Sequence, residues 1–288
     1  MTTDQGPDAP AAPTSEVATG SAPAPWDDAS VLAASTAWSW VPDFARSVRT
    51  EEYLVVAYPE TFLTPTSARV LDAVGAGRDP RDLVDEVHAV ARDLGRDRLW
   101  WIVSDTTRPA GLEDELLRRG GAVVERSDVL AFDLSQGEVP DLGVPGDVAV
   151  RRVVDRADVL EALLISQLAF GGNEPDDAEV DVNVAEVDTG LADDSGGRVL
   201  ATVDGRPAST GGWTLAGSVA RFWGAGTHPD LRGRGAYRAV LQARLRHVLD
   251  AGATLALTHG RVETSSPILR SVGFRRYGEQ RQLVVDLT

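Results

Sequence analysis

The spacing of apolar positions divides the second half of the chain into alternating helices and strands. Apolar residues recur at helical intervals from 236 to 250, and the apolar run at 254–258 is typical of a buried strand. The same patterns predict further strands at 148–153, 198–205, 220–226, 273–278 and 282–287, another around 208–213, and helices over 159–164, 180–191 and 266–273. The predicted order is β-α-α-β-β-β-α-β-α-β-β, so we expect a mixed α/β domain.

The end of the first half of the chain resembles the end of the second. "LLRRGGAVVERSDVLAFDLS" (116–135) parallels "ILRSVGFRRYGEQRQLVVDLT" (268–288) within one inserted residue, and a helix, a glycine and an apolar strand precede each. Such self-similarity is what a tandem duplication leaves, although matches this short also arise by chance. The sequence therefore predicts a first domain at 26–135, a linker rich in Gly and Pro at 136–147, and a second domain at 148–288.

Composition narrows the classes of function. The formal net charge of −16 argues against a nucleic-acid binder, because such a protein must neutralise phosphates. Cysteine is absent and the four histidines are scattered, so we expect no metal site. Residues 1–25 have neither the basic start nor the apolar run of a signal peptide, and no stretch approaches the roughly 20 apolar residues of a membrane span. We expect a disordered tail at 1–25 and a cytoplasmic protein that does not enter a membrane.

A glycine-rich loop with two arginines, "THPDLRGRGAY" (227–237), joins a predicted strand to a predicted helix. Such a loop presents backbone N–H groups at the positive end of the helix dipole, which favours binding of an anion. Arg232 and Arg234 add positive charge, which suits a multiply charged ligand. The loop lacks the Lys and Ser/Thr of a P-loop, and Pro229 stands where a dinucleotide fingerprint has its third glycine. The alternative is a solvated basic helix start.

This loop resembles the acetyl-CoA loop of the GNAT superfamily of N-acyltransferases, whose pattern is Arg/Gln-x-x-Gly-x-Gly/Ala after a strand. Arg232 and Gly235 match the pattern, and Tyr237 occupies its final position, which is usually small. "SSPILRSVGF" (265–274) resembles the second coenzyme-contacting helix of the same superfamily. The resemblance covers about residues 147–288 well and the first half only weakly.

The resemblance implies an α/β (α+β) fold of two tandem GNAT-like domains, each a mixed, mostly antiparallel sheet flanked by helices. It also implies acetyl-CoA as co-substrate and no metal. The coenzyme-binding residues that it implies are Ala225, Gly226, Thr227, Arg232, Gly233, Arg234, Gly235, Ala236, Tyr237 and Ser266.

The corresponding stretch of the first half, "VGAGRDPRDLVDEV" (74–87), lacks the Arg-x-x-Gly-x-Gly spacing. Its Pro80 and neighbouring charges are typical of an ordinary helix start. We therefore expect the first half to be a degenerate copy that binds no coenzyme and supports the second half or shapes its substrate cleft.

Catalytic groups are harder to identify. Many GNAT enzymes protonate the departing thiolate with a tyrosine four residues before a Gly-Phe pair, and this chain has Leu269 there. Tyr277 is the nearest alternative, although a tyrosine in a terminal strand more often packs. Glu263 and His259 are candidate bases near the end of the strand at 254–258. Glu263 could equally cap the helix that follows.

The predicted helix within 176–194 carries eight carboxylates and no arginine. In the resembling fold this helix borders the acceptor cleft, where an acidic rim would attract a cationic amine. The alternative is a solvated acidic face. The function expected is transfer of acetyl from acetyl-CoA to a small cationic amine or a peptide N-terminus, by a monomer or homodimer. A non-catalytic acyl-CoA-binding or regulatory module is the alternative from another class.

Overall fold

The computed structural model describes residues 26–59, 65–70, 77–171 and 173–287. The tail expected at 1–25 lies outside these residues. The first half contains, in chain order, α1 (Asp28–Thr36), β1 (Arg46–Arg49), β2 (Tyr53–Ala57), β3 (Thr66–Val70), α2 (Pro80–Asp93), β4 (Arg98–Ser104), α3 (Leu112–Arg118) and β5 (Ala122–Asp133). The second half contains β6 (Val148–Arg152), α4 (Arg156–Phe170), α5 (Asp177–Asp193), β7 (Gly196–Val203), β8 (Arg206–Ala216), β9 (Val219–Thr227), the 3₁₀ turn η1 (Pro229–Leu231), α6 (Ala236–Asp250), β10 (Leu255–Arg261), α7 (Ser265–Ser271) and β11 (Arg275–Asp286).

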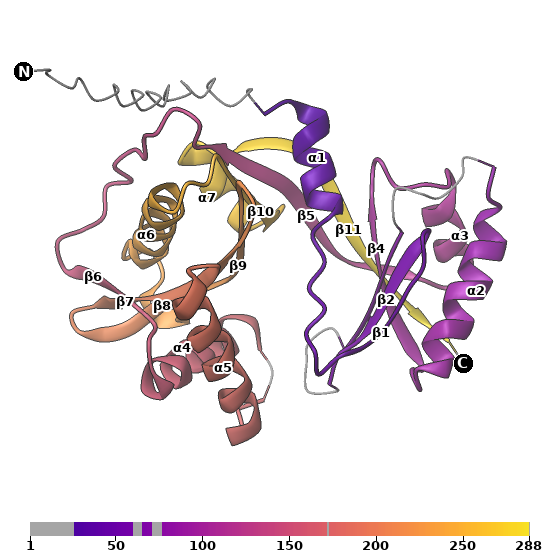
Figure 1. Ribbon diagram of the computed structural model, residues 1–288, viewed down its shortest axis with the longest axis horizontal. Helices are drawn as coiled ribbons and strands as arrows, with labels where there is room; N and C mark the ends of the chain where they lie inside the picture. The colour runs from indigo at the N-terminus through magenta and orange to yellow at the C-terminus, as the bar shows by residue number, and fades with distance from the viewer. Residues whose placement is uncertain (1–25, 60–64, 71–76, 172, 288) are drawn as a thin grey trace, which may run out of the picture.

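The strands of both halves form one continuous sheet in the order β1-β2-β3-β4-β11-β5-β10-β9-β8-β7-β6 (Figure 1). The sheet is mixed: β3 is parallel to β4 and β9 is parallel to β10, while the other neighbours are antiparallel. In each half a long helix connects the two parallel strands: α2 connects β3 to β4, and α6 lies between β9 and β10 in the chain. The fold class predicted from the sequence is therefore confirmed.

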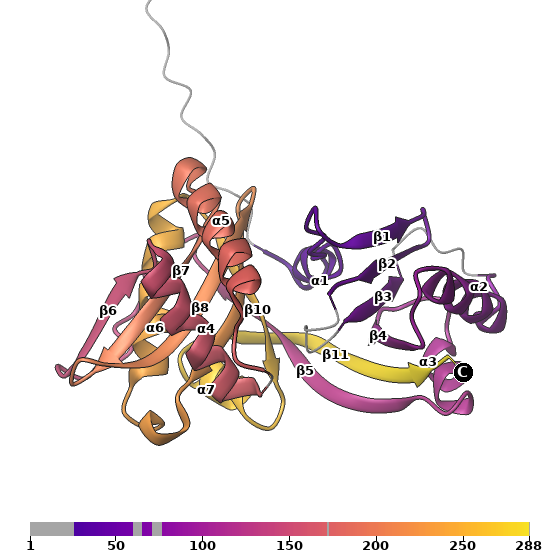
Figure 2. The same ribbon diagram turned by 90° about the horizontal axis from the view of Figure 1, so that it is seen from below.

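The two halves exchange a strand at the centre of the sheet. The first half's β5 lies between β10 and β11, and the second half's β11 lies between β4 and β5. These two strands are twelve residues long, run antiparallel to each other and extend from one half into the other (Figure 2). They are also the two segments whose sequences match, so the repeat corresponds to a symmetric structural pair.

The prediction of two closing strands, at 273–278 and 282–287, was wrong. β11 is a single strand that shifts register by one residue between Arg276 and Gly278. A bulge accommodates an extra residue and bends the strand without ending it. The chain therefore continues along β5 instead of turning back, and β5 occupies the place that a final hairpin strand would have taken.

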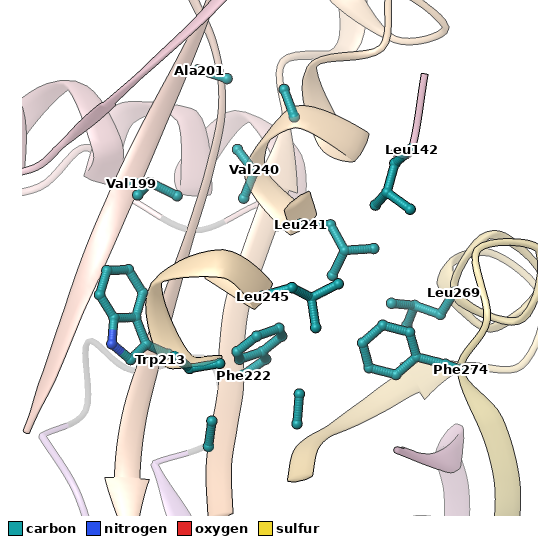
Figure 3. Close-up of a cluster of buried hydrophobic side chains, with 14 of the residues drawn as sticks. Leu142, Val199, Ala201, Trp213, Phe222, Val240, Leu241, Leu245, Leu269 and Phe274 are labelled. Atoms are coloured by element: carbon teal, nitrogen blue, oxygen red, sulfur yellow. The ribbon is translucent and has the colours of Figure 1, made fainter. Parts of the chain in front are cut away.

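Helices cover both faces of the sheet in the second half. Along β7, Val199, Ala201 and Val203 point to the core under α6, whereas Leu200 points to the core under α4 and α5. The larger core packs Trp213, Phe222, Leu241, Leu245 and Phe274 between α6, α7 and the sheet (Figure 3). Helix α1 packs against the central strands on the other face, with Val31 beside Val129 and Leu257.

The stretch between the halves is packed against α6. The Leu142 side chain lies in the core, and its N–H donates to Gln242 Oε1 at 2.7 Å. Pro145 lies against the start of α6, close to Gly235. The linker predicted at 136–147 therefore contributes packing of its own.

The strand exchange predicts that the second half does not fold alone. A fragment of residues 136–288 lacks β5, so one edge of β10 has no partner and the first residues of β11 have no neighbour. Circular dichroism and urea titration of that fragment should show no cooperative transition. The matched control is the full chain cut at an inserted protease site after Gln136, which keeps both strands and should unfold cooperatively. Cooperative unfolding of the isolated fragment would contradict the prediction.

Candidate functional site

Strands β9 and β10 part in the middle of the second half's sheet. They pair in parallel only from Val219 to Phe222. At the fork, the Thr258 hydroxyl donates to the Phe222 carbonyl at 3.1 Å and so satisfies the last carbonyl before the strands diverge. Beyond this point the facing edges of β9 and β10 have no ladder partner in each other. A ligand with amide groups can hydrogen-bond to such an edge.

The open part of β9 begins at a bulge. Thr210 pairs with Gly226 but Gly212 pairs with Trp223, so β9 has one residue more than β8 between these pairs. Gly224 lies in this bulge at φ 60°, a conformation that favours glycine. Gly226 is needed for a different reason, because a Cβ there would lie 2.7 Å from the Ala169 Cβ in α4.

The loop after β9 leaves a run of backbone N–H groups open at the start of α6. Gly233 and Gly235 have φ values of 75° and 84°. The N–H groups of residues 233–238 donate to no acceptor among the residues that the structure describes. Gly235 caps α6 without a side-chain bond. Consecutive N–H groups that converge at a helix start are suited to hold phosphate oxygens.

The arginines of this loop differ in their partners. The Arg234 guanidinium binds the carboxylates of Asp147 at 2.7 Å and Asp204 at 3.1 Å. Arg232 is exposed and forms no ion pair with a described residue. Arg238 donates only to the Leu142 carbonyl, at 3.2 Å. Arg232 and Arg238 therefore carry the positive charge that a bound anion would meet, and Arg234 fastens the loop to its neighbours.

The first half starts its equivalent helix differently. Asp79 caps α2 by accepting from the Arg81 N–H at 2.9 Å, and Pro80 has no N–H to offer. Residues 74–76 of the stretch compared above lie outside the described residues. A carboxylate thus occupies the helix start in the first half, where the second half leaves N–H groups open.

Of the candidate catalytic residues, only His259 lies beside the fork. It follows Thr258 directly, its ring stacks on Trp38 at 5.1 Å between centroids, and its Nε2 lies 2.8 Å from the Ser35 hydroxyl. Burial, together with the nearby Arg69 guanidinium, lowers the pKa of His259 to about 3. The ring is therefore neutral at pH 7 and resists taking up a proton.

Tyr277 and Glu263 lie elsewhere. Tyr277 is in β11, two strands from β10 and so roughly 10 Å from it, with the Arg275 guanidinium 4.8 Å from its ring centroid. Burial raises the pKa of the Tyr277 hydroxyl. Glu263 is exposed in the turn before α7 and makes no hydrogen bond or ion pair with a described residue. It does not cap α7, whose N-cap Thr264 has no side-chain bond.

The hydroxyl groups of two further sequence candidates, Ser266 and Thr227, lie within hydrogen-bond distance of other side chains. The buried Ser266 hydroxyl donates to the Asp128 carboxylate at 2.5 Å, which ties α7 to β5. Leu269, in the usual tyrosine position, is buried in the core. The Thr227 hydroxyl lies 3.0 Å from that of Ser209, which donates to the Gly226 carbonyl.

A charged group that the sequence did not reveal lies beside the bulge. Arg198 of β7 is only 8% exposed, and its guanidinium lies 5.0 Å from the ring centroid of Trp223. Glu179 and Glu186, two turns apart on one face of α5, interact electrostatically with it. Burial raises the pKa of both carboxyl groups, and Arg198 opposes the rise. The sequence pattern could not reveal this arrangement, because a single Arg in a strand does not indicate which side chains will surround it.

Most other carboxylates of α5 have structural partners. Asp177 and Asp181 pair with Arg156 of α4, and Asp194 lies 3.3 Å from Arg152 of β6. Asp176 and Asp193 accept from backbone N–H groups at the two ends of the helix. The segment itself carries no arginine, but Arg152 and Arg156 from other elements compensate part of its charge. Glu179, Glu186 and Asp188 have no ion pair with a described residue.

Within the described ranges, no group of three or more metal-binding side chains lies together. No helix in this part of the chain is long and apolar enough to cross a membrane.

The fork, the bulged strand and the loop lie in a fold that comparison with solved structures identifies. The structure is similar to a GCN5-related N-acetyltransferase from Kribbella flavida (TM-score 0.62, 21% identity, 84% of this chain and 89% of that one). It is also similar to one from Sphaerobacter thermophilus (TM-score 0.62, 17%, 82% and 81%) and to a tandem GNAT protein from the clavulanic acid biosynthesis pathway (TM-score 0.55, 15%, 89% and 88%). No family model and no curated protein matches the sequence. The chain has the tandem GNAT fold.

The neutral histidines predict acid sensitivity. Burial also lowers the pKa of His88, to about 4. Below pH 6.5 the unfolded chain binds protons at His88 and His259, whereas the folded chain leaves both rings neutral. The free energy of unfolding should therefore fall as the pH drops from 6.5 to about 4. Each histidine contributes a slope of up to about 1.4 kcal/mol per pH unit. Urea unfolding at pH 7, 6 and 5 should show a shallower slope for His259→Gln. An equal slope would contradict the prediction.

Proposed function

We propose that the protein is an N-acetyltransferase that moves an acetyl group from acetyl-CoA to a small amine. The observation that carries the proposal is the sequence of fork, bulge and loop along β9. The pyrophosphate would bind the N–H groups of residues 233–238, with Arg232 and Arg238 beside it. The pantetheine amides would bind the open edge of Ala225 to Thr227, which brings the thioester to the bulge at Gly224.

The acceptor would approach from the face that carries α5. Val219, Arg221 and Trp223 point to this face of β9, because Ala220 and Phe222 point into the core under α6. Glu186 supports the role of base better than His259, since a carboxyl with a raised pKa holds a proton more readily than an imidazole with a pKa of about 3.

In this reaction the acceptor ammonium loses one proton to Glu186, and the neutral nitrogen attacks the acetyl carbonyl carbon. The carbon–sulfur bond then breaks, and a second proton passes from nitrogen to the thiolate of CoA. Leu269 offers no proton, so solvent at the open fork would relay the second proton. The first half would contribute β5 and the cover formed by α1 and Trp38.

The alternative is an acyl-CoA-binding module without turnover. The buried Leu269 favours it, because the usual acid is missing from its usual place. Both proteins would bind acetyl-CoA, but only an enzyme releases free thiol when an amine is added. A thiol-release assay over a panel of small amines therefore separates the two.

Coenzyme binding is tested at Gly233. Gly235→Glu is unsuitable, because a Cβ at Gly235 would lie 2.5 Å from Pro145 and disturb the fold. Gly233 has open space around it, so Gly233→Asp adds a negative charge where the pyrophosphate would bind. We expect the variant to lose the rise in melting temperature that acetyl-CoA gives the parent, because a ligand that binds the folded state stabilises it.

The matched control for Gly233→Asp is Gly252→Asp. Gly252 follows the other end of α6, has a φ of 85° and also has open space. Gly252→Asp should have similar backbone strain, because both glycines have a positive φ, but it should keep the full rise in melting temperature on addition of acetyl-CoA. An undiminished rise in folded Gly233→Asp would remove the loop from the proposal.

The base is tested at Glu186. Glu186→Gln should lower kcat by about 100-fold, since general-base catalysis contributes roughly 10²–10⁴-fold. The parent kcat should fall as the pH drops through the raised pKa of Glu186, and the variant should lose that inflection. Asp188→Asn, on the same helix, is the control and should keep the parent profile. A parent-like profile in Glu186→Gln would assign the proton to another group.

A further inference from the structure

Among the described residues two arginines are buried, Arg198 and Arg244, and they differ in their partners. Arg244 donates to the Gly212 carbonyl at 3.2 Å. Arg198 is 8% exposed, yet it forms no hydrogen bond or ion pair within the described residues. Its guanidinium lies over the ring of Trp223, which in turn lies against Gly212 where a Cβ would clash.

A buried charge without a hydrogen-bond partner in the protein is costly unless water or a ligand supplies one. Burial lowers the pKa of Arg198 to about 10, so the group stays charged at pH 7. A planar guanidinium binds a carboxylate with two parallel hydrogen bonds, which is the partner that its geometry fits best. Glu179 and Glu186 interact electrostatically with the Arg198 guanidinium, but neither is within ion-pair distance of it.

The position of Arg198 connects it to the reacting groups. Its Nη2 lies 3.9 Å from the place where a Cβ on Gly224 would stand, which is at the bulge. A carboxylate bound there would leave an amine on the adjacent carbon within reach of the thioester. That amine would lie on the side of Glu179 and Glu186, whose charges suit an ammonium.

We propose that the acceptor is a zwitterion, a free amino acid whose carboxylate binds Arg198 and whose amine faces Glu179 and Glu186. This inference rests on the proposed function and names its substrate class. A purely cationic amine would leave Arg198 without a partner and would be repelled by it. A peptide N-terminus has an amide in place of the adjacent carboxylate, so peptides are disfavoured.

The experiment compares three forms of each acceptor: the L-amino acid, its carboxamide and the amine that lacks the carboxyl group. Thiol release at saturating acetyl-CoA should favour the amino acid by at least about 100-fold in kcat/KM, because a buried group left unpaired rejects the analogue strongly. Arg198→Met should remove that preference by raising KM for the amino acid while changing the amine little. Arg198→Lys should restore part of it.

Arg156→Met is the control. Arg156 pairs with carboxylates of α5, so its loss should change kcat/KM for all three acceptor forms equally. Equal use of the three forms by the parent, with thiol release intact, would overturn the zwitterion and leave the proposed function standing. A loss of kcat for every form in Arg198→Met would also overturn it, because Arg198 would then act on the acetyl oxygen.

Calorimetry of the protein loaded with CoA distinguishes the remaining case. Binding of the amino acid that depends on Arg198, without thiol release from acetyl-CoA, would support the subsite and contradict the proposed enzyme. Absence of both binding and thiol release for every amino acid would overturn the inference.

Discussion

The antiparallel pair of β5 and β11 is the constraint on which the rest of the structure depends. Each strand completes the sheet of the half to which it does not belong by sequence, so neither sheet closes without the other. This pairing brings α1 and Trp38 from the first half onto the face of β10, where Trp38 stacks on His259. The first half is therefore structurally necessary to the second, because it supplies a strand to the sheet and a cover beside the fork.

Local patterns predicted most of the second half. The helices at 159–164, 180–191 and 236–250 and the strands between them were confirmed because each follows from apolar spacing, which is a property of neighbouring residues. The closing hairpin was not predicted correctly. Whether Gly278 turns the chain or bulges within a strand is decided by β5, which is far away in sequence: Arg276 pairs with Leu130 and Gly278 with Val129. A one-residue register shift leaves no mark in the local pattern.

The glycine-rich loop was found from the sequence because its chemistry lies in consecutive residues. The residue roles, however, remain predictions, and the structure divides them by their neighbours. Arg232 and Arg234 look equivalent in the sequence, but Asp147 and Asp204 bind only Arg234. Glu179 and Asp181 likewise look equivalent, but α4 places Arg156 beside Asp181 and β7 places Arg198 near Glu179. Partners from distant elements decide which charges hold the fold and which stay available.

The acidic composition of the chain explains why most arginines of the second half's framework pair with carboxylates. The chain has 44 acidic residues against 28 basic ones, so carboxylates are abundant and an arginine readily finds one. Arg152, Arg156 and Arg234 each bind a carboxylate and join an element of the second half to another. Arg232 and Arg238 at the loop and Arg198 at the bulge have no such partner among the described residues, and they lie at the two ends of the open part of β9. In the proposed reaction, the phosphates would bind at one end of this segment of β9 and the acceptor carboxylate at the other, with the acyl group between them.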